Sequence, residues 1–478
     1  MVRALPIAST APATPASAAP ARVGVISLGC PKNTVDTETL LGRIAEQHVV
    51  CADPADAEVV VVNTCAFIDQ AREESLAVIA EMTRWKAEGR IKGLVVTGCL
   101  AQRWGEELHA QHPQVDSVVG MAEYGRINDV LREVLTARDL AEAAQAPWRT
   151  LVARDPSFAI TAQTGRLRVT PPHYAYLQVS EGCDNACTFC SIPTFRGLFR
   201  SKPRAAILEE ARELAASGAV ELNLISQDTT DWGKDLPGRP GLEDLLRDLA
   251  AVDGVRWLRL LYAYPGHVSP GLIAALRELS PRVVPYLDMP IQHVSSPVLK
   301  RMGRRHTKEQ TVELLERLRA EVPGLVLRTT FICGFPGETE AQFEEVLELV
   351  RRFRFERLGA FPYSHEPGTP AGERFPDDVP QAEKDRRVEA VYAAQAPVAH
   401  AHALALVGRE VEVLVEGPAD DGQLLGRTPW DAPEIDPHVL LDPAPGSPPG
   451  VWPPAPGSLV RARVVEAVEY DVRAEWAG

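Results

Sequence analysis

The sequence contains few cysteines and no long apolar run. Its eight cysteines are too few and too far apart to form a disulfide scaffold in a chain of 478 residues. No run approaches the ~18 consecutive apolar residues that a membrane span requires, so we expect no membrane association. Residues 1–20 are rich in Ala, Pro, Ser and Thr and lack the apolar stretch of a secretory signal. We interpret them as a disordered leader and expect a cytoplasmic protein. In that reducing compartment, clustered cysteines typically bind metals or catalyse reactions.

Positive charge is also scarce. The chain has 50 Lys and Arg residues against 65 Asp and Glu residues, which gives a net charge of −15. This balance argues against a general nucleic-acid binder, which needs a basic surface, but it is compatible with a basic protein partner. Hydrophobic residues make up 45% of the chain, and its length indicates a globular protein of two to four domains.

Residues 21–140 alternate short apolar runs with helical patterns. Buried strands are expected at 22–28, 58–63 and 91–97, and helices follow at 34–47, 70–88 and 101–111. Such alternation is typical of a small α/β domain with a parallel sheet. Residues 141–170 have mixed character, and we interpret them as a connector.

Residues 171–400 repeat the strand–helix pattern about six times, which predicts a partial (βα)6 TIM-like barrel, short of the eight units that close a full one. A helix is expected over 381–406, kinked or ended by Pro397. Residues 401–478 read as a small antiparallel β-barrel with a Pro- and Gly-rich stretch at 442–457. In the larger barrel, the expected strands are 174–179, 221–226, 257–262, 284–288, 327–331 and 358–363, and the expected helices are 203–217, 242–251, 269–279, 307–321 and 339–353. In the smaller barrel, the expected strands are 411–415, 423–427 and 459–468.

The most specific motif is a C-x3-C-x2-C triplet formed by Cys183, Cys187 and Cys190. It directly follows the first expected barrel strand, and active sites of β/α barrels lie on loops at that end of the strands. Three thiolates can hold a four-iron cluster and leave one iron open for a substrate. A structural zinc site is an alternative, but zinc normally takes four protein ligands and no further C-x2-C or His lies nearby. A non-catalytic electron carrier is another, although ferredoxins use a different spacing and need no barrel.

Three further cysteines, Cys30, Cys65 and Cys99, are far apart in the sequence, yet each ends an expected strand. The ends of parallel strands share one edge of a sheet, so the three thiols are expected to converge there and to hold a second cluster with an open iron. Gly29 and Gly98 would let the backbone approach closely. The alternative is three unrelated buried cysteines. Two others, Cys51 and Cys333, have no comparable partners and are interpreted as core residues.

The triplet resembles the signature of the radical S-adenosylmethionine (SAM) superfamily. With the three dispersed cysteines and the C-terminal barrel, the chain resembles the methylthiotransferases over nearly its whole length except the leader. Several stretches resemble the branch that modifies the small-subunit ribosomal protein S-twelve, whereas its MiaB and MtaB relatives modify adenosines in tRNA. These stretches are Leu28-Gly-Cys-Pro-Lys-Asn33, Ser226-Gln-Asp-Thr-Thr230, Tyr363-Ser-His-Glu-Pro-Gly-Thr369 and Gly426-Arg-Thr-Pro-Trp-Asp-Ala-Pro-Glu-Ile435.

The resemblance implies an activity and its cofactors. It implies two [4Fe-4S] clusters, one on Cys30, Cys65 and Cys99 and one on Cys183, Cys187 and Cys190 that binds SAM. It further implies sulfur insertion at the β-carbon of an aspartate, with two SAM molecules used per product, one for the methyl group and one for the radical. An external low-potential reductant and a sulfur source would be needed.

The resemblance also implies residues that contact SAM. Phe189 would lie beside the adenine, although a packing role at the barrel mouth is an equal alternative. The run from Gly334 to Glu338 would lie along the adenine side, although Pro and Gly make an ordinary β-turn equally well. Arg196 and Arg200 would bind the SAM carboxylate or the substrate, the alternative being arginines on a solvated face.

The C-terminal segment resembles a TRAM domain, a module that binds RNA in many proteins. Residues 404–478 contain five arginines, no lysine and thirteen acidic residues, a net charge of −8. Such a surface repels phosphate and attracts a basic partner. The sequence therefore favours the basic protein S-twelve, free or within the small subunit, over tRNA, and tRNA adenosine 2-methylthiolation is the alternative.

Overall fold

The computed structural model describes residues 20–136, 149–153, 155–156, 160–444 and 452–476. The expected leader up to residue 19, residues 141–148 of the expected connector and residues 445–451 of the Pro-rich stretch lie outside this part. The chain forms two compact units. The first comprises residues up to Val169 with Glu181–Asp184 and Cys190–Lys202, and the second comprises Thr170–Ser180, Asn185–Phe189 and Pro203 onward. In the described part, no helix is both long enough and apolar enough to cross a membrane.

The first unit is built on a six-stranded sheet in the order β2-β1-β3-β4-β5-β6, and every neighbouring pair is parallel. The three expected strands and the helix after each are confirmed. Three strands of only two or three residues were missed, because so short a run carries no periodicity. The strands are β1 (Arg22–Ser27), β2 (Val49–Cys51), β3 (Val59–Thr64), β4 (Gly93–Gly98), β5 (Ser117–Val119) and β6 (Thr150–Leu151), and the helices are α1 (Pro31–Ala45), α2 (Asp69–Ala87), α3 (Cys99–Gln111) and α4 (Ile127–Thr136).

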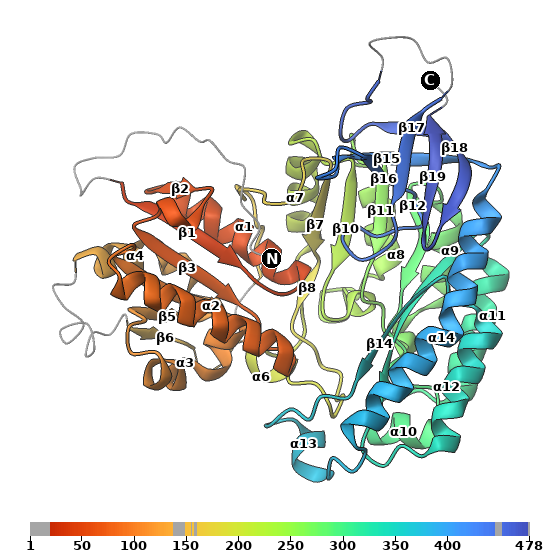
Figure 1. The fold of residues 1–478 in the computed structure, drawn as a ribbon, viewed down its shortest axis with the longest axis horizontal. Helices are drawn as coiled ribbons and strands as arrows, with labels where there is room; N and C mark the ends of the chain where they lie inside the picture. The colour runs from red at the N-terminus through yellow and green to blue at the C-terminus, as the bar shows by residue number, and fades with distance from the viewer. Residues whose placement is uncertain (1–19, 137–148, 154, 157–159, 445–451, 477–478) are drawn as a thin grey trace. The chain divides into compact units, whose positions relative to one another are not determined.

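Burial explains why this sheet needs helices. Every residue of β3 and of β4 is buried, so neither face of the central strands meets solvent. A parallel sheet of this kind must be covered on both faces, and the crossover helices α1–α4 flank it (Figure 1). The apolar side of the strongly amphipathic α4, including Ile127 and Leu131, packs into the same core.

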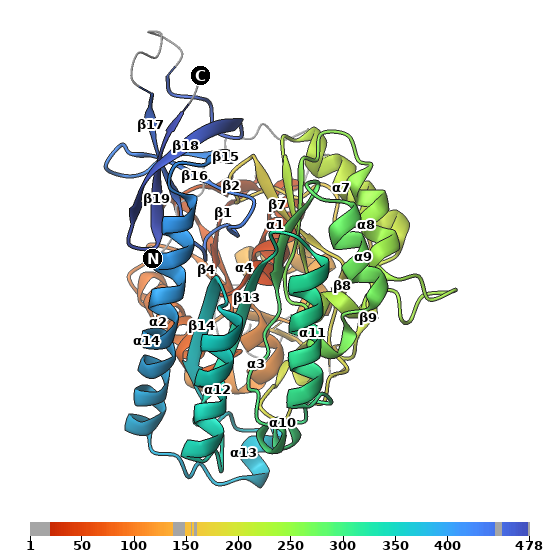
Figure 2. The ribbon, with the colours of Figure 1, turned by 90° about the vertical axis from the view of Figure 1, so that its right-hand side faces the viewer.

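The second unit contains an open six-stranded parallel sheet in the order β14-β13-β12-β11-β10-β7, which confirms the partial barrel. Most of its connecting helices run along the outer side of the sheet (Figure 2). The strands are β7 (Tyr174–Gln178), β10 (Glu221–Ile225), β11 (Trp257–Leu260), β12 (Val283–Asp288), β13 (Val326–Cys333) and β14 (Arg357–Pro362), and the helices are α7 (Arg204–Ala216), α8 (Leu242–Ala250), α9 (Pro270–Glu278), α10 (Ser296–Arg301), α11 (Lys308–Glu321) and α12 (Glu340–Phe353).

A long helix, α14 (Gln381–Leu406), leads from this sheet to the C-terminal strands. The sequence left open that Pro397 ends it, and that alternative is wrong, because the helix continues to Leu406. Proline removes one hydrogen-bond donor. Tertiary contacts hold the helix on both sides of it: before Pro397 the Gln395 amide donates to the Phe355 carbonyl, and after it Ala403 and Leu406 pack in the core of the C-terminal barrel.

The C-terminal strands form a closed five-stranded barrel in the order β15-β16-β17-β19-β18. Four pairs are antiparallel as expected, but β17 and β19 pair in parallel. Closure leaves no free sheet edge, which protects so small a barrel from edge pairing. The strands are β15 (Glu410–Pro418), β16 (Leu424–Arg427), β17 (Val439–Pro443), β18 (Leu459–Val468) and β19 (Asp471–Trp476).

The connection between β16 and β17 contacts the beginnings of the large-sheet strands. The Arg427 guanidinium, fully buried, donates to the Glu221 carboxylate at 2.6 Å, and Arg259 donates to the same carboxylate at 2.8 Å. Further along the connection, the hydroxyls of Tyr174 and Tyr286 donate to Glu434 and Asp436, and Arg357 pairs with Asp431. This buried polar network closes the amino-terminal end of the sheet. The stretch from Gly426 to Ile435, singled out by resemblance, therefore has a structural role here.

Candidate metal and cofactor sites

Cys30, Cys65 and Cys99 lie at the carboxyl ends of three adjacent strands. Cys30 is the N-cap of α1 just after β1, Cys65 directly follows β3, and Cys99 begins α3 after β4. Burial raises the pKa of the Cys99 thiol to about 12; the charge of Arg196 lowers it and the proximity of Cys65 and Cys30 raises it, and burial outweighs the arginine. Burial and the proximity of Cys30 likewise raise the pKa of Cys65. The structure thus brings the three cysteines together, as their positions in the sequence predict.

One side chain, Asn33, connects the three cysteine loops. Its amide nitrogen donates to the carbonyls of Leu28 and Thr64, both at 2.9 Å, and these residues flank the first two loops. Its Oδ1 accepts from the Cys99 thiol at 3.5 Å. Asn63 in turn donates to the Asn33 carbonyl at 3.0 Å. Because these bonds come from different strand ends, they fix the loops relative to each other.

Gly29 and Gly98 allow the loops to approach, as expected. Gly29 has φ +94°, and a Cβ there would lie 2.7 Å from the Cβ of Cys65. Gly98 has φ +91°, and a Cβ there would lie 2.3 Å from Oδ1 of Asn63 and 2.5 Å from the carbonyl oxygen of Thr64. Any other residue would be strained at both positions and would push the cysteine loops apart.

Arg196 lies in the first unit beside these thiols, a setting that the sequence did not suggest. Its side chain is fully buried, so the alternative of a solvated arginine is wrong for this residue. The guanidinium donates to Oδ1 of Asn33 at 2.7 Å and to Sγ of Cys99 at 3.3 Å. It also forms ion pairs with Asp36 at 2.8 Å and Glu181 at 3.0 Å. Arg200 is more exposed, and its guanidinium donates to the carbonyls of Leu198 and Arg196.

The loop with Cys183, Cys187 and Cys190 follows β7, and its residues are divided between the two units. In the first unit, Cys183 is buried, and its N–H donates to the Gly197 carbonyl at 3.2 Å. In the second unit, the half-buried Cys187 lies 3.9 Å from a guanidinium nitrogen of Arg304. Cys190 is half-buried, and no cysteine of the chain forms a disulfide, which keeps all the thiols available to a metal. The two remaining cysteines, Cys51 and Cys333, are buried in the hydrophobic cores as expected.

Two of the expected SAM-contacting segments lie in the second unit. Phe189 packs against a small apolar cluster that includes Phe335 and Tyr363. These contacts agree with its alternative role as a packing residue. In the turn that starts at Gly334, the buried Glu338 carboxylate accepts the N–H groups of Gly334 and Phe335 at 2.7 and 3.0 Å. Arg387 donates to its other oxygen at 2.9 Å. Glu338 therefore fixes the backbone of this turn from the inside.

A polar group that sequence reasoning missed follows β10 and β11. The carboxylate of the buried Asp228 lies 2.8 Å from Nδ1 of His267 and accepts from the Asn185 amide at 2.7 Å. Burial lowers the pKa of His267, but the hydrogen bond to Asp228 and the charges of Asp228 and Asp231 outweigh it, so the pKa is raised. Asp228 lies in one of the quoted stretches, whereas no local pattern marks His267. The group places a buried carboxylate and an imidazole in hydrogen-bond contact at the end of the sheet that carries the cysteine loop.

The comparisons with known proteins agree with this architecture. The Radical SAM superfamily model matches residues 177–350, the Uncharacterized protein family UPF0004 model matches 22–120, and the TRAM domain model matches 407–477. The radical SAM methyltransferase TsrM from Kitasatospora setae, solved with cobalamin and a [4Fe-4S] cluster, has 14% identity and a TM-score of 0.54 over 74% of this chain and 77% of its own. The cobalamin-dependent radical enzyme OxsB gives a TM-score of 0.51 over 78% of this chain and 56% of its own, also at 14% identity. Both share the fold. The chain is thus a radical SAM enzyme, with an iron–sulfur cluster and SAM as the cofactors of that class.

Relatives of similar length narrow the family. Proteins from Geobacter sulfurreducens, Anaeromyxobacter sp. (strain K) and Myxococcus xanthus are 44%, 48% and 45% identical to this chain, over 95%, 94% and 95% of it. The alignments cover 98%, 92% and 91% of those proteins. All three are named ribosomal protein uS12 methylthiotransferase RimO. The chain belongs to the RimO family of radical SAM methylthiotransferases.

Proposed function

We propose that this enzyme adds a methylthio group to the β-carbon of an aspartate in ribosomal protein uS12 and uses two SAM molecules per turnover. The observation that carries the proposal is that a second trio of thiols, Cys30, Cys65 and Cys99, lies at the ends of three adjacent strands, in addition to the C-x3-C-x2-C loop. One trio accounts for radical formation, and the other for sulfur insertion. We infer the substrate from the relatives, which are named for uS12.

The donor sets fit two iron–sulfur clusters. Burial raises the pKa of the Cys65 and Cys99 thiols, so without a cation they are protonated at neutral pH. Iron stabilises the thiolate form, and three soft sulfur ligands on one sheet edge are typical of such a site. When bound, the cluster on Cys183, Cys187 and Cys190 supplies the electron that cleaves SAM, and the one on Cys30, Cys65 and Cys99 supplies the iron that holds sulfur. An external reductant and a sulfur source complete the reaction.

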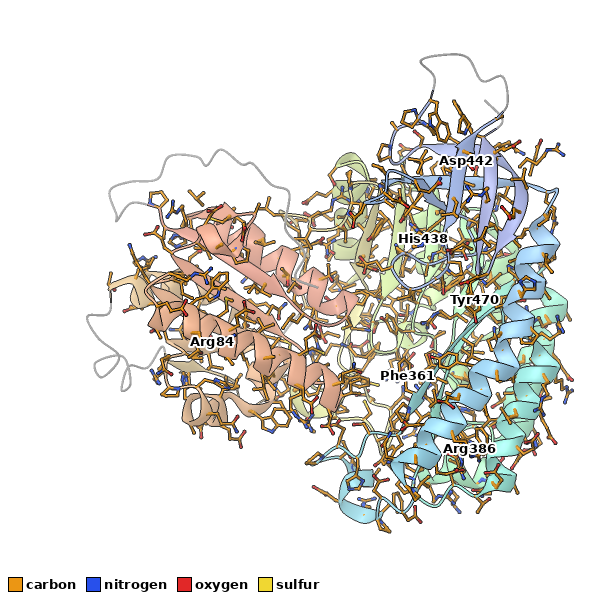
Figure 3. All side chains as sticks on the ribbon, viewed as in Figure 1. Arg84, Phe361, Arg386, His438, Asp442 and Tyr470 are labelled. Atoms are coloured by element: carbon orange, nitrogen blue, oxygen red, sulfur yellow. The ribbon has the colours of Figure 1, made fainter. Side chains whose placement is uncertain are left out.

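The proposal assigns roles to the polypeptide around these ligands. The backbone of the turn from Gly334 to Glu338 and the ring of Phe189 bind the adenine of SAM, while the Glu338 carboxylate keeps the turn in one conformation. Arg200 binds a carboxylate of SAM or substrate. The resemblance implied the same role for Arg196, but we assign it no contact with SAM, because its guanidinium donates to buried groups of the first unit. Phe361, 52% exposed at the end of β14, offers an apolar contact for the substrate (Figure 3).

We divide these roles among the segments 21–140 for the sulfur-holding cluster, 171–400 for the SAM cluster and 401–478 for substrate binding. Residues 1–20 and 141–170 are the leader and the connector. Ribosomal proteins and a reducing environment place the reaction in the cytoplasm.

The charge of the C-terminal barrel favours a basic protein substrate. Its net charge includes buried groups, because Asp431 and Asp436 pair with arginines or a tyrosine inside the protein. Among the described residues from 404 onward, seven acidic residues and three arginines are exposed, a net charge of −4. Asp442 and Tyr470 mark this barrel in Figure 3. The exposed charge stays negative, which attracts a basic protein and repels the phosphates of tRNA.

An anaerobic assay on the reconstituted full-length protein tests the proposal. The enzyme receives SAM, a low-potential reductant and sulfide, together with either purified uS12, assembled small subunits or tRNA. Mass spectrometry then locates any methylthio adduct. We expect the adduct on uS12 in one or both protein forms, together with 5′-deoxyadenosine. An adduct on tRNA and none on uS12 would establish the alternative function.

Iron analysis of cysteine variants tests the two clusters separately. Replacing Cys30, Cys65 and Cys99 by alanine should remove half of the iron and abolish methylthiolation, while reductive cleavage of SAM continues. Replacing Cys183, Cys187 and Cys190 should also remove half of the iron, but it should abolish SAM cleavage. Replacing Cys51 and Cys333, which are core residues, should leave the iron content unchanged. Full iron content after loss of either trio would refute the two-cluster assignment.

A further inference from the structure

Arg196 is a buried cation whose environment includes one of the candidate cluster ligands. Its guanidinium lies within hydrogen-bond distance of a sulfur, an amide oxygen and two carboxylates, those of Asp36 and Glu181. Ordinary buried ion pairs involve no thiol. Here the charge lies 3.3 Å from Sγ of Cys99, in an environment from which water is excluded.

We propose that Arg196 is a positioning residue that sets the reduction potential of the cluster on Cys30, Cys65 and Cys99. This inference rests on the proposed function, in which those three cysteines hold a cluster. Hydrogen bonds to the sulfur ligands and the local net charge are two of the quantities that tune iron–sulfur potentials. A fixed positive charge stabilises the reduced cluster, which carries one more negative charge, over the oxidised one. Arg196 therefore raises the potential.

The shape of the guanidinium explains why an arginine occupies this position. Its planar fork has two terminal nitrogens in fixed directions. Nη1 donates to Glu181, while Nη2 lies among the acceptors of Asn33, Asp36 and Cys99. Lysine keeps the charge but concentrates it on one nitrogen. Because Asn33 also holds the loops of Cys30 and Cys65, the arginine fixes the position of the Cys99 sulfur relative to both.

The same residue connects the two cysteine trios along the chain. Arg196 ends the short helix α6 (Ile192–Arg196), which begins two residues after Cys190. Ile192 and Phe195 of this helix pack in the core of the first unit. The segment after the radical SAM motif is thus anchored beside Cys99 by apolar packing and by the Arg196 bonds. A short stretch of main chain, from Cys190 to Arg196, therefore joins a ligand of one cluster to the residue that tunes the other.

The test measures the potential of this cluster alone. In the full-length protein, Cys183, Cys187 and Cys190 are replaced by alanine, so that the remaining iron belongs to the other trio. Arg196→Gln, Arg196→Lys and the control Arg132→Gln are then introduced separately. Arg132 lies in the same unit but on the surface, where its charge is screened by solvent. Iron content, the spectrum of the reduced cluster and the midpoint potential are recorded anaerobically by redox titration.

We expect Arg196→Gln to shift the reduction equilibrium at least tenfold toward the oxidised form, which for a one-electron couple is a fall of about 59 mV. Arg196→Lys should recover part of this shift, and Arg132→Gln should cause none. Because Arg196→Gln leaves two buried carboxylates uncompensated, the double variant with Asp36→Asn provides a second, better balanced measurement. It should still show an altered spectrum and a lower potential than Asp36→Asn alone.

The outcomes separate this inference from the proposed function. If the parent with three alanines holds no cluster, the proposed function fails. If the parent holds a cluster but its potential is the same with Arg196→Gln, or if the single and double variants shift no more than Arg132→Gln does, Arg196 is only a structural ion pair and the inference is wrong. Equal shifts with glutamine and lysine would show that only hydrogen-bond geometry acts, which would overturn the statement that the positive charge of Arg196 raises the potential.

Discussion

The most direct stability test concerns Glu221, the carboxylate that lies between two buried arginines at the beginning of β10. Its oxygens accept from Arg259 at 2.8 Å and from Arg427 at 2.6 Å, and all three side chains are fully buried. Burial raises the pKa of Glu221, but the two arginines outweigh this, and the net shift is downward. The carboxylate is therefore ionised in the folded protein.

Replacing Glu221 with the isosteric glutamine should cost about 3–5 kcal/mol of unfolding free energy, because it leaves a buried charge without compensation. The uncompensated residue is Arg259, since Arg427 keeps an ion pair with Glu416. One nitrogen of Arg259 has no hydrogen-bond partner among the described residues, which places the cost toward the upper end. Replacing Arg259 as well by glutamine should recover about 1–3 kcal/mol, because the two changes affect one network.

Denaturation of the full-length protein by urea, followed by tryptophan fluorescence, measures this loss. Trp430, one of the eight tryptophans of the chain, lies in the connection that the network holds. The matched control is Glu278→Gln, because Glu278 is exposed and its ion pairs with two arginines are long, at 3.8 Å. It should change the free energy of unfolding by less than about 0.5 kcal/mol. If Glu221→Gln costs no more than this control, the buried network does not hold the C-terminal barrel to the sheet.

The lowered pKa of Glu221 fixes the sign of a pH effect. A carboxylate whose folded pKa lies below its ordinary value of 4.5 contributes stability above that pH and loses it as the pH falls through the folded pKa. The stability difference between the wild type and Glu221→Gln should therefore be full near neutral pH and shrink below about pH 4.5. A difference that grows in acid would contradict an ionised Glu221.

Three further substitutions test the loops around Cys30, Cys65 and Cys99 and one buried histidine. Gly98→Ala introduces a Cβ 2.5 Å from the Thr64 carbonyl at φ +91°. It should lower the free energy of unfolding by about 1–3 kcal/mol and remove the iron held by Cys30, Cys65 and Cys99. Gly89→Ala, at φ +72° with open space around it, should keep the iron, and iron analysis of both variants measures the effect. Asn33→Asp places an oxygen against two carbonyls and should also lose that iron but retain SAM cleavage; unchanged iron would contradict its connecting role. Burial lowers the pKa of His293 to about 3. The free energy of unfolding of the cluster-free protein should therefore fall by up to about 1.4 kcal/mol per pH unit as the pH drops from 6.5 toward 3. Denaturation at several pH values should show a smaller dependence of this free energy on pH for His293→Gln.

Local sequence patterns were sufficient to predict the fold class. Strands such as β3 and β4 are uniformly apolar and are followed by helical periodicity, so their type and parallel arrangement could be read directly. The patterns failed where an element is short or depends on its surroundings. The three-residue β2 and the parallel pairing of β17 with β19 left no signal, and α14 passes through Pro397 because packing supports it.

The candidate ligands could be predicted from the sequence because each follows a strand, and the ends of parallel strands must meet at one edge. That rule needs only the order of residues along the chain, and it placed Cys30, Cys65 and Cys99 together. The surroundings of these ligands could not be predicted in this way. The bond from Arg196 to Asn33 joins residues 163 positions apart, and the bond from Arg427 to Glu221 spans 206.

The sequence alone therefore determined the class of fold, the six thiols and the chemistry they imply. Only the tertiary structure decided which charges neutralise one another in the interior, that Arg196 lies beside a thiol, and that the stretch from Gly426 to Ile435 closes one end of the sheet. The physical reason is range. Periodicity and turn signals reflect interactions between neighbouring residues, whereas a buried ion pair forms between residues brought together by the packing of whole elements, and an arginine in the sequence carries no mark of the carboxylate it will contact.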